Sequence, residues 1–292
     1  MSSSAFLQFL FSGITSGAVY AFVALAFSVT FNSSGIVNFA QGQFVMIGGM
    51  VASSLHTSFG VSVLPAMLIG IAVASVAGLI MGVGFILPML PFGEFTLILV
   101  TLGLGNVIEG IALAIWGTDP RALPSLVDMD ALRVGGAYLS VDTILIVTMI
   151  LFTLVAFSLF IRYTRWGRAM RATSIDTTIA ASLGVNVPLT IVLAFVLSAV
   201  FGGLAGVLLT PLISTSPQTG LLMTLKGFTG AVLGGISSPI GSVVGGFALG
   251  LIEAFATGFI SSTYQNAIGL GLMILLLMAR PQGLFTRTTR QA

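Results

Sequence analysis

Residues 187–210 read VPLTIVLAFVLSAVFGGLAGVLLT and contain no charged side chain. About 20 apolar residues in a helix cross the roughly 30 Å hydrocarbon core of a bilayer, so this stretch predicts a transmembrane helix. Of the 292 residues, 57% are apolar and 6% are charged, whereas soluble domains carry about 25% charged residues. We therefore expect an all-α polytopic transmembrane helical bundle, since a membrane barrel would show short alternating segments.

Nine apolar stretches predict the crossings. They cover residues 6–31, 36–55, 62–87, 93–117, 141–161, 187–210, 222–236, 240–258 and 264–280. The seventh is short and contains Lys226, so an alternative with eight crossings stays open, in which this segment is re-entrant. No linker interrupts the chain, and we expect a single transmembrane domain over 1–292.

Basic loop residues predict the orientation, because Lys and Arg collect on the cytoplasmic side. One group follows the fifth span and a second group closes the chain: Arg162, Arg165, Arg168, Arg171, Arg280, Arg287 and Arg290. Nine crossings place both groups inside and the N-terminus outside. The outer loop 118–140 then carries only Arg121 and Arg133, and its acidic residues include Asp119 and Asp128.

The inner loop 162–186 contains a stretch with good helix formers, residues 168–183, and Gly184 is a natural C-terminal stop. A short helix on the cytoplasmic face is suited to docking a partner. A basic loop that only sets the topology is the alternative.

Three ionisable residues lie inside apolar spans, where a charge costs about 2.5–3.5 kcal/mol on insertion scales. They are Glu109, Lys226 and Glu253. They indicate either a wet path or proton site, or an internal ion pair such as Lys226 with Glu253. The spacing along the chain does not decide between these alternatives, and Glu109 lies nearer a span end.

The segment Asn38-Phe39-Ala40-Gln41-Gly42-Gln43 opens the second span with three amide side chains. A helix break exposes backbone groups that must be satisfied in protein or in a cavity, and discontinuous helices often face substrate. We therefore expect Asn38, Gln41 and Gln43 to face a path through the bundle, the alternative being an ordinary loop. Glycines four residues apart, such as Gly13/Gly17, Gly230/Gly234 and Gly246/Gly250, predict close helix packing.

Several functional classes have no support in the sequence. There is no cysteine and one histidine, His56, and Lys226 is the only lysine. It follows no Gly-x-x-x-x-Gly pattern, so the chain has no phosphate-binding P-loop. We expect no enzymatic activity, no cofactor or metal and no nucleic-acid partner.

Three stretches together resemble the LivH-type permeases of branched-chain amino-acid ABC importers. They are the Gly35–Phe44 segment, the Arg162–Val185 loop, and Lys226–Ile236 with Glu253 beyond it. The resemblance extends over nearly the whole chain. It implies a second related permease subunit, two separate ATPase subunits and a periplasmic substrate-binding protein, in a bacterial inner membrane and in contact with its lipids.

The resemblance also implies roles for particular residues. The translocation path would include Asn38, Gln41, Gln43, Lys226 and Glu253. The ATPase-coupling residues would be Arg168, Arg171, Asp176, Ala180, Ala181 and Gly184. Docking of the binding protein would use Asp119, Arg121, Asp128 and Arg133.

Two departures from the family pattern matter. Gln41 and Gln43 stand where the family often has His and Glu, which favours a net-neutral or apolar cargo. The inner loop 88–94 lacks the basic residues common there. We expect an importer permease for branched-chain or related hydrophobic amino acids. Urea, amides, aromatic acids or sugars are alternative cargoes, and an ion-coupled carrier or a non-transporting scaffold are alternative functions.

Overall fold

The computed structural model describes residues 3–127 and 129–259, together with 267–269, 271, 274, 275 and 278. The helices of the first half are α1 (Ser3–Ser34), α2 (Gln41–Phe59), α3 (Val63–Met81), α4 (Leu87–Met89) and α5 (Glu94–Trp116). Those of the second half are α6 (Val141–Tyr163), α7 (Arg165–Ile175), α8 (Thr177–Ser182), α9 (Val187–Leu209), α10 (Thr219–Gly234) and α11 (Pro239–Phe259). A π-helical turn, Gly82–Ile86, joins α3 to α4, and a 3-10 turn, Leu90–Phe92, follows α4.

Six segments among the described residues are long and apolar enough to cross a membrane: Ser4–Ser34, Val63–Phe92, Glu94–Trp116, Val141–Tyr163, Val187–Leu209 and Pro239–Phe259. The predicted polytopic helical membrane protein is thereby confirmed. The predicted spans 36–55 and 222–236 correspond to α2 and α10, which are not among these six segments. The ninth predicted span, 264–280, lies mostly outside the described residues, as do Arg280, Arg287 and Arg290.

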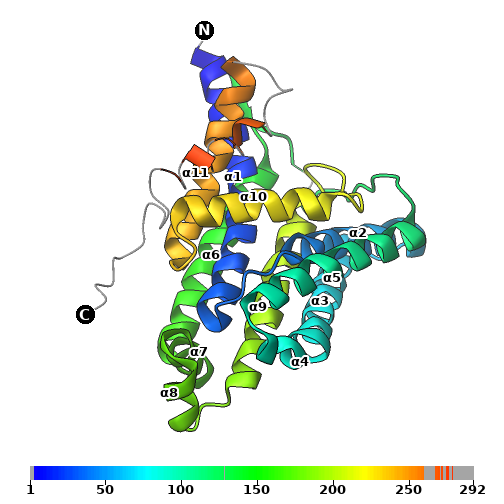
Figure 1. Ribbon diagram of the computed structural model, residues 1–292. Coiled ribbons are helices and arrows are strands. Elements are labelled where there is room, and N and C mark those ends of the chain that lie inside the picture. The colour runs from blue at the N-terminus through cyan, green and yellow to red at the C-terminus, as the bar shows by residue number, and fades with distance from the viewer. Residues whose placement is uncertain are drawn as a thin grey trace.

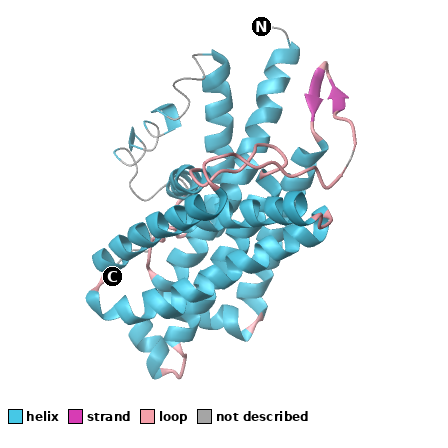
Figure 2. Ribbon diagram, turned by 90° about the vertical axis from the view of Figure 1, so that its right-hand side faces the viewer, coloured by secondary structure: helices cyan, strands magenta, loops and turns pink. Residues whose placement is uncertain are grey.

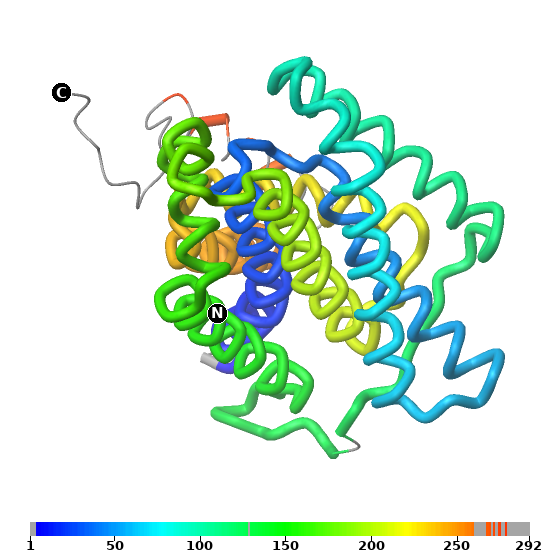
Figure 3. The backbone as a smooth tube through the Cα atoms, turned by 90° about the horizontal axis from the view of Figure 1, so that it is seen from below, coloured from blue at the N-terminus to red at the C-terminus, as the bar shows by residue number. Residues whose placement is uncertain are grey.

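Two helices form the centre of the bundle. In the most apolar 18-residue stretch of each helix, 78% of the residues of α1 and 72% of those of α9 are buried. The corresponding shares for α5 and α6 are 17% and 22%. Figure 3 shows α1 and α9 in the middle, with α6 on one side and α3 and α5 on the other. The outer helices present apolar side chains outward, such as Val107, Ile111 and Phe152. A hydrophobic outer surface is what contact with lipid requires.

Glycine contacts let the helices approach closely, as predicted. A Cβ added to Gly250 of α11 would lie 2.3 Å from the backbone of Gly17 on α1, and one added to Gly246 would lie 2.5 Å from Ala21. One added to Gly245 would lie 2.1 Å from the Gly230 carbonyl oxygen of α10. Figure 1 shows α1 and α11 side by side and α10 running across them.

The loop 118–140, for which no helix was predicted, contains two short strands. Strands β1 (Leu132–Val134) and β2 (Ala137–Leu139) form an antiparallel hairpin in the 118–140 loop, drawn beside the N-terminal end of α1 in Figure 2. Gly135 and Gly136 make the turn with φ of 60° and 83°, values that favour glycine. The Tyr138 amide donates to Gln8 Oε1 at 2.9 Å, which fixes the hairpin to α1.

Candidate translocation path and coupling surface

The helix break predicted at Asn38 lies between α1 and α2, over residues 35–40. Asn38 is fully buried, and its Oδ1 accepts a hydrogen bond from the Ala40 amide at 3.0 Å. The Phe39 amide donates to Thr101 Oγ1 of α5 at 3.2 Å. Protein groups thus satisfy backbone amides that the missing helical turn leaves free.

Gln41, the first residue of α2, connects three helices. Its Nε2 donates to the Ser198 carbonyl of α9 at 3.1 Å, and its Oε1 accepts from Asn38 Nδ2 at 3.4 Å. Ser198 Oγ lies within hydrogen-bonding distance of Gln41 Oε1 and of the Ala26 carbonyl of α1. All three side chains are fully buried. A satisfied buried network of this kind fixes the positions of its members.

The start of α2 crosses the start of α10 at a contact between glycines. A Cβ on Gly42 would lie 1.9 Å from the Gly220 carbonyl oxygen. The Gly42 amide donates to Thr224 Oγ1 at 2.9 Å, and this hydroxyl donates to the Gly220 carbonyl at 3.0 Å. Gln43 is buried beside Gly220, and its Oε1 has no hydrogen-bond partner among the described residues. An unpaired buried acceptor is costly. A donor on a bound molecule could therefore bind to Gln43 Oε1.

Lys226 and Glu253 form an ion pair between α10 and α11. Lys226 is 7% exposed and Glu253 is fully buried. The Tyr20 hydroxyl of α1 donates to Glu253 Oε2 at 3.0 Å, and Lys226 Nζ lies 5.7 Å from the centre of the Tyr20 ring. The ion-pair alternative for these charges is therefore what the structure shows. Glu109, by contrast, is half-buried on α5.

The five predicted path residues thus lie inside the bundle in two groups. Asn38, Gln41 and Gln43 surround the start of α2, while Lys226 and Glu253 lie between α10 and α11. Both groups contact α10, through Thr224 and Lys226. Tyr20, Ser198 and Thr224 complete these groups and were not predicted, although a hydroxyl within an apolar span is itself a signal of an internal partner.

The inner loop forms two helices where the sequence predicted one over 168–183. Asp176 separates them and caps α8, since its Oδ1 accepts from the amides of Thr178 at 2.7 Å and Ile179 at 2.9 Å. Gly184 follows with φ of 84°, the left-handed value typical after a helix end. The predicted coupling residues Arg168, Arg171, Asp176, Ala181 and Gly184 are exposed, and Ala180 is buried.

An apolar stripe adds to this surface. Ile175, Ile179 and Leu183 are 82%, 59% and 78% exposed.

Two clefts adjoin α7: one of about 290 Å³ between α6, α7 and the start of α11, and one of about 520 Å³ between the end of α1, α8 and Glu94. The second contains Ser34, Asp176 and Ser237, so the end of α1 and the turn after α10 lie at this same end of the bundle.

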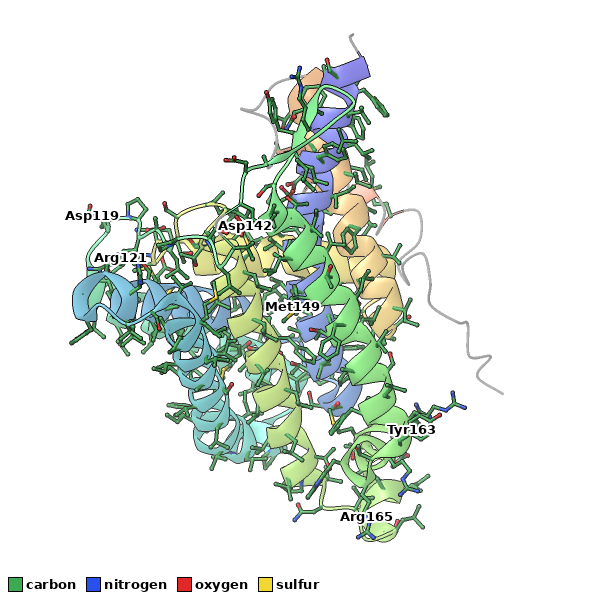
Figure 4. All side chains as sticks on the ribbon, turned by 180° about the vertical axis from the view of Figure 1, so that it is seen from behind. Asp119, Arg121, Asp142, Met149, Tyr163 and Arg165 are labelled. Atoms are coloured by element: carbon green, nitrogen blue, oxygen red, sulfur yellow. The ribbon has the colours of Figure 1, made fainter. Side chains whose placement is uncertain are left out.

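The predicted docking residues lie away from α7 and α8. Arg121 pairs with Thr215 through backbone hydrogen bonds of 2.8 and 2.9 Å, and Ser53 Oγ of α2 donates to the Ala122 carbonyl at 2.6 Å. Asp119 and Arg133 are exposed, and Asp128 lies outside the described residues. Figure 4 shows Asp119 and Arg121 well separated from Tyr163 and Arg165.

A helical membrane bundle with buried amides at the break before α2 and an exposed helical pair at one end fits a membrane permease component. Residues 9–278 match the family model described as "Branched-chain amino acid transport system / permease component". The chain belongs to this family.

Curated relatives agree with this assignment. The chain is 32% identical to the high-affinity branched-chain amino acid transport system permease protein LivH of Escherichia coli K12 and 30% identical to BraD of Pseudomonas aeruginosa. Each comparison covers 97% of this chain and 96% of the relative. LivM of Escherichia coli K12 is 26% identical over 94% of this chain and 69% of its own length. These relatives are permease components of transport systems by name, as the sequence predicted for this chain.

One solved structure has a similar fold. PsaBC from Streptococcus pneumoniae in complex with Fab superposes with a TM-score of 0.50 at 14% identity, covering 94% of this chain and 93% of that one. At this identity the likeness concerns the fold alone.

Proposed function

We propose that this chain is the permease subunit of an ATP-binding-cassette importer in a bacterial inner membrane, and that it carries branched-chain or related hydrophobic amino acids. The observation behind the proposal is the family match over residues 9–278, joined to buried amides and no charged residue at the break between α1 and α2. Gln43 Oε1, which has no hydrogen-bond partner among the described residues, offers a neutral acceptor that suits a zwitterionic cargo with an apolar side chain.

The proposed partners follow from the family and from the surfaces of the chain. A second, related permease subunit completes the path, as the separately named LivH and LivM relatives suggest. The importer has two ATPase subunits, and one of them binds the α7–α8 surface of this chain, where Ile175, Ile179 and Leu183 are exposed. A periplasmic binding protein docks at the hairpin loop, through Asp119, Arg121, Asp128 and Arg133.

Nine crossings within one permease domain, residues 1–292, remain the proposed topology. Segment 35–59 begins next to the cleft that contains Asp176 and ends near Arg121, because Ser53 bonds Ala122. The segment from Thr215 through α10 runs the opposite way, from Arg121 to Ser237 in that cleft. We take both segments as crossings, as the predicted topology requires. The N-terminus then lies outside and the C-terminus inside.

The proposed mechanism is alternating access. ATP binding by the partner subunits moves α7 and α8, and the bundle changes between outward-open and inward-open states. Cargo must bind these states with different affinity for the cycle to proceed. Asn38, Gln41 and Gln43 line the path, and the Lys226–Glu253 pair holds α10 to α11 beside it.

Uptake of radiolabelled leucine into proteoliposomes that contain both permeases, the ATPases and the binding protein tests the proposal. We expect uptake only with ATP inside the vesicles and binding protein outside. Uptake by the purified chain alone, driven by a pH gradient, would support the ion-coupled carrier instead. Competition with unlabelled isoleucine, phenylalanine, urea and glucose identifies the cargo class.

A further inference from the structure

The outward face of α6 leads directly into an aromatic and basic surface. Phe152, Val155 and Leu159 are 67%, 57% and 51% exposed, and their spacing of three and four residues places them on one helix face. Tyr163, 66% exposed, continues the same row at the last residue of α6. Apolar side chains that face outward along a membrane helix contact lipid tails, so this row ends where the lipid headgroups begin.

Arginines accompany the aromatic residues at this point. The Arg162 guanidinium lies 5.4 Å from the centre of the Tyr163 ring, a cation–π arrangement that holds it against the helix end. Arg165 and the 48%-exposed Trp166 begin α7, where Thr164 Oγ1 accepts the Gly167 amide at 2.9 Å. Tyr163 and Arg165 are labelled at this junction in Figure 4.

None of the described residues forms an ion pair with Arg162 or Arg165. The loop 162–186 has four arginines and one acidic residue, Asp176, whose carboxylate is bonded to the amides that begin α8. Among the described residues, the ion pair that the structure contains joins Lys226 to Glu253, on α10 and α11 and not in this loop. Exposed Arg162 and Arg165 therefore offer two cations to an external anion at headgroup depth.

We infer that Arg162, Tyr163, Arg165 and Trp166 bind the headgroup of an anionic phospholipid, with its acyl chains along the α6 row. The two arginines contact the phosphate, and the aromatic rings lie at the boundary between headgroup and tail, where Tyr and Trp are enriched in membrane proteins. This lipid site is distinct from the proposed coupling residues Arg168 and Arg171. It rests on the membrane location of α6 and is independent of the transported cargo.

Native mass spectrometry of the full-length chain tests this site, with phosphatidylglycerol titrated against phosphatidylcholine. We expect tighter binding of phosphatidylglycerol, and a loss of roughly 25-fold in Arg162→Gln/Arg165→Gln, since each basic residue near an anionic surface contributes roughly a fivefold factor. Arg162→Lys/Arg165→Lys should retain most of the binding. Arg133→Gln, which removes an exposed arginine from β1, should bind as the unchanged chain does.

Three outcomes would overturn the inference. They are equal binding of the two lipids, an equal loss in the Arg133 variant, and unchanged lipid binding in a double variant that no longer co-purifies with the ATPase subunits. The last result would assign these arginines to the ATPase contact. Leucine uptake is a separate measurement, so failure of the lipid site and failure of the proposed transport function give different results.

Discussion

The ammonium of Lys226 on α10 is paired with the carboxylate of Glu253 on α11, and the Tyr20 hydroxyl of α1 bonds the other carboxylate oxygen. Three helices therefore meet at one buried charge pair. Removing one member of a buried pair strands the other charge and costs about 3–5 kcal/mol, whereas replacing both can be nearly neutral.

We expect Glu253→Gln or Lys226→Met alone to reduce the thermal stability of the purified protein strongly. The double variant Lys226→Met/Glu253→Gln should recover much of the loss, because no unpaired charge remains. Thermal unfolding of detergent-purified protein measures this. A double variant less stable than both single variants would show that the pair contributes more than charge balance, and loss of uptake with full stability in Glu253→Gln would favour a proton site.

Gly42→Ala should prevent α2 and α10 from reaching their crossing. The added Cβ would lie 1.9 Å from the Gly220 carbonyl oxygen and 2.5 Å from the Thr224 amide nitrogen, and backbone atoms have little room to move. We expect a sharp drop in the monodisperse fraction on size-exclusion chromatography. Gly103→Ala on α5 is the matched control, since nothing lies within 4 Å of its added Cβ. Equal behaviour of the two variants would contradict the close crossing.

The sequence predicted features that depend on neighbouring residues, but not contacts between residues that are far apart along the chain. Hydropathy identified the six membrane-length helices, and the amide side chains of Asn38, Gln41 and Gln43 identified the break before α2, because both signals are local. The pairing of Lys226 with Glu253 was left open, because a separation of 27 residues says nothing about two helices meeting in space. The partners Tyr20 and Ser198 are also set by packing between distant segments.

Two local signals were available and missed. Gly135-Gly136 between short apolar stretches is a hairpin signal, yet the expectation of an all-helical chain left no place for strands. Asp176 is a good N-cap residue, and it divides the predicted inner helix into α7 and α8. In the second case a single residue with a strong capping preference outweighed the average helix propensity of its neighbours.

Ile179→Asp should weaken binding of the ATPase subunits to the proposed coupling surface. Ile179 is 59% exposed on α8 and belongs to the apolar stripe with Ile175 and Leu183, so a charge there would be desolvated on contact. Co-purification with tagged ATPase should fall at least tenfold. Val134→Asp in β1, an exposed apolar position remote in sequence, should leave co-purification unchanged; a similar decline there would argue against a specific surface.

Arg133→Glu should reduce docking of the binding protein without affecting the fold. Arg133 is exposed in β1, opposite Tyr138 in the hairpin register, and a charge reversal at an interface rim chiefly slows association. Surface plasmon resonance with the immobilised transporter should show a several-fold lower association rate that is sensitive to salt. An unchanged rate would place the docking surface elsewhere on the loop.

The glycine contacts between α1 and α11 have a mechanical consequence. Where Gly17 meets Gly250 and Gly246 meets Ala21, backbone lies against backbone. Sliding of α1 along α11 would break the Tyr20–Glu253 hydrogen bond and separate the Phe9 and Phe259 rings, whose centres lie 6.4 Å apart. We therefore expect the two helices to move as one rigid rod. The chain has no cysteine, and spin labels attached through Phe6→Cys on α1 and Val244→Cys on α11 should keep the same separation in every nucleotide state; a changed separation would show that the helices slide.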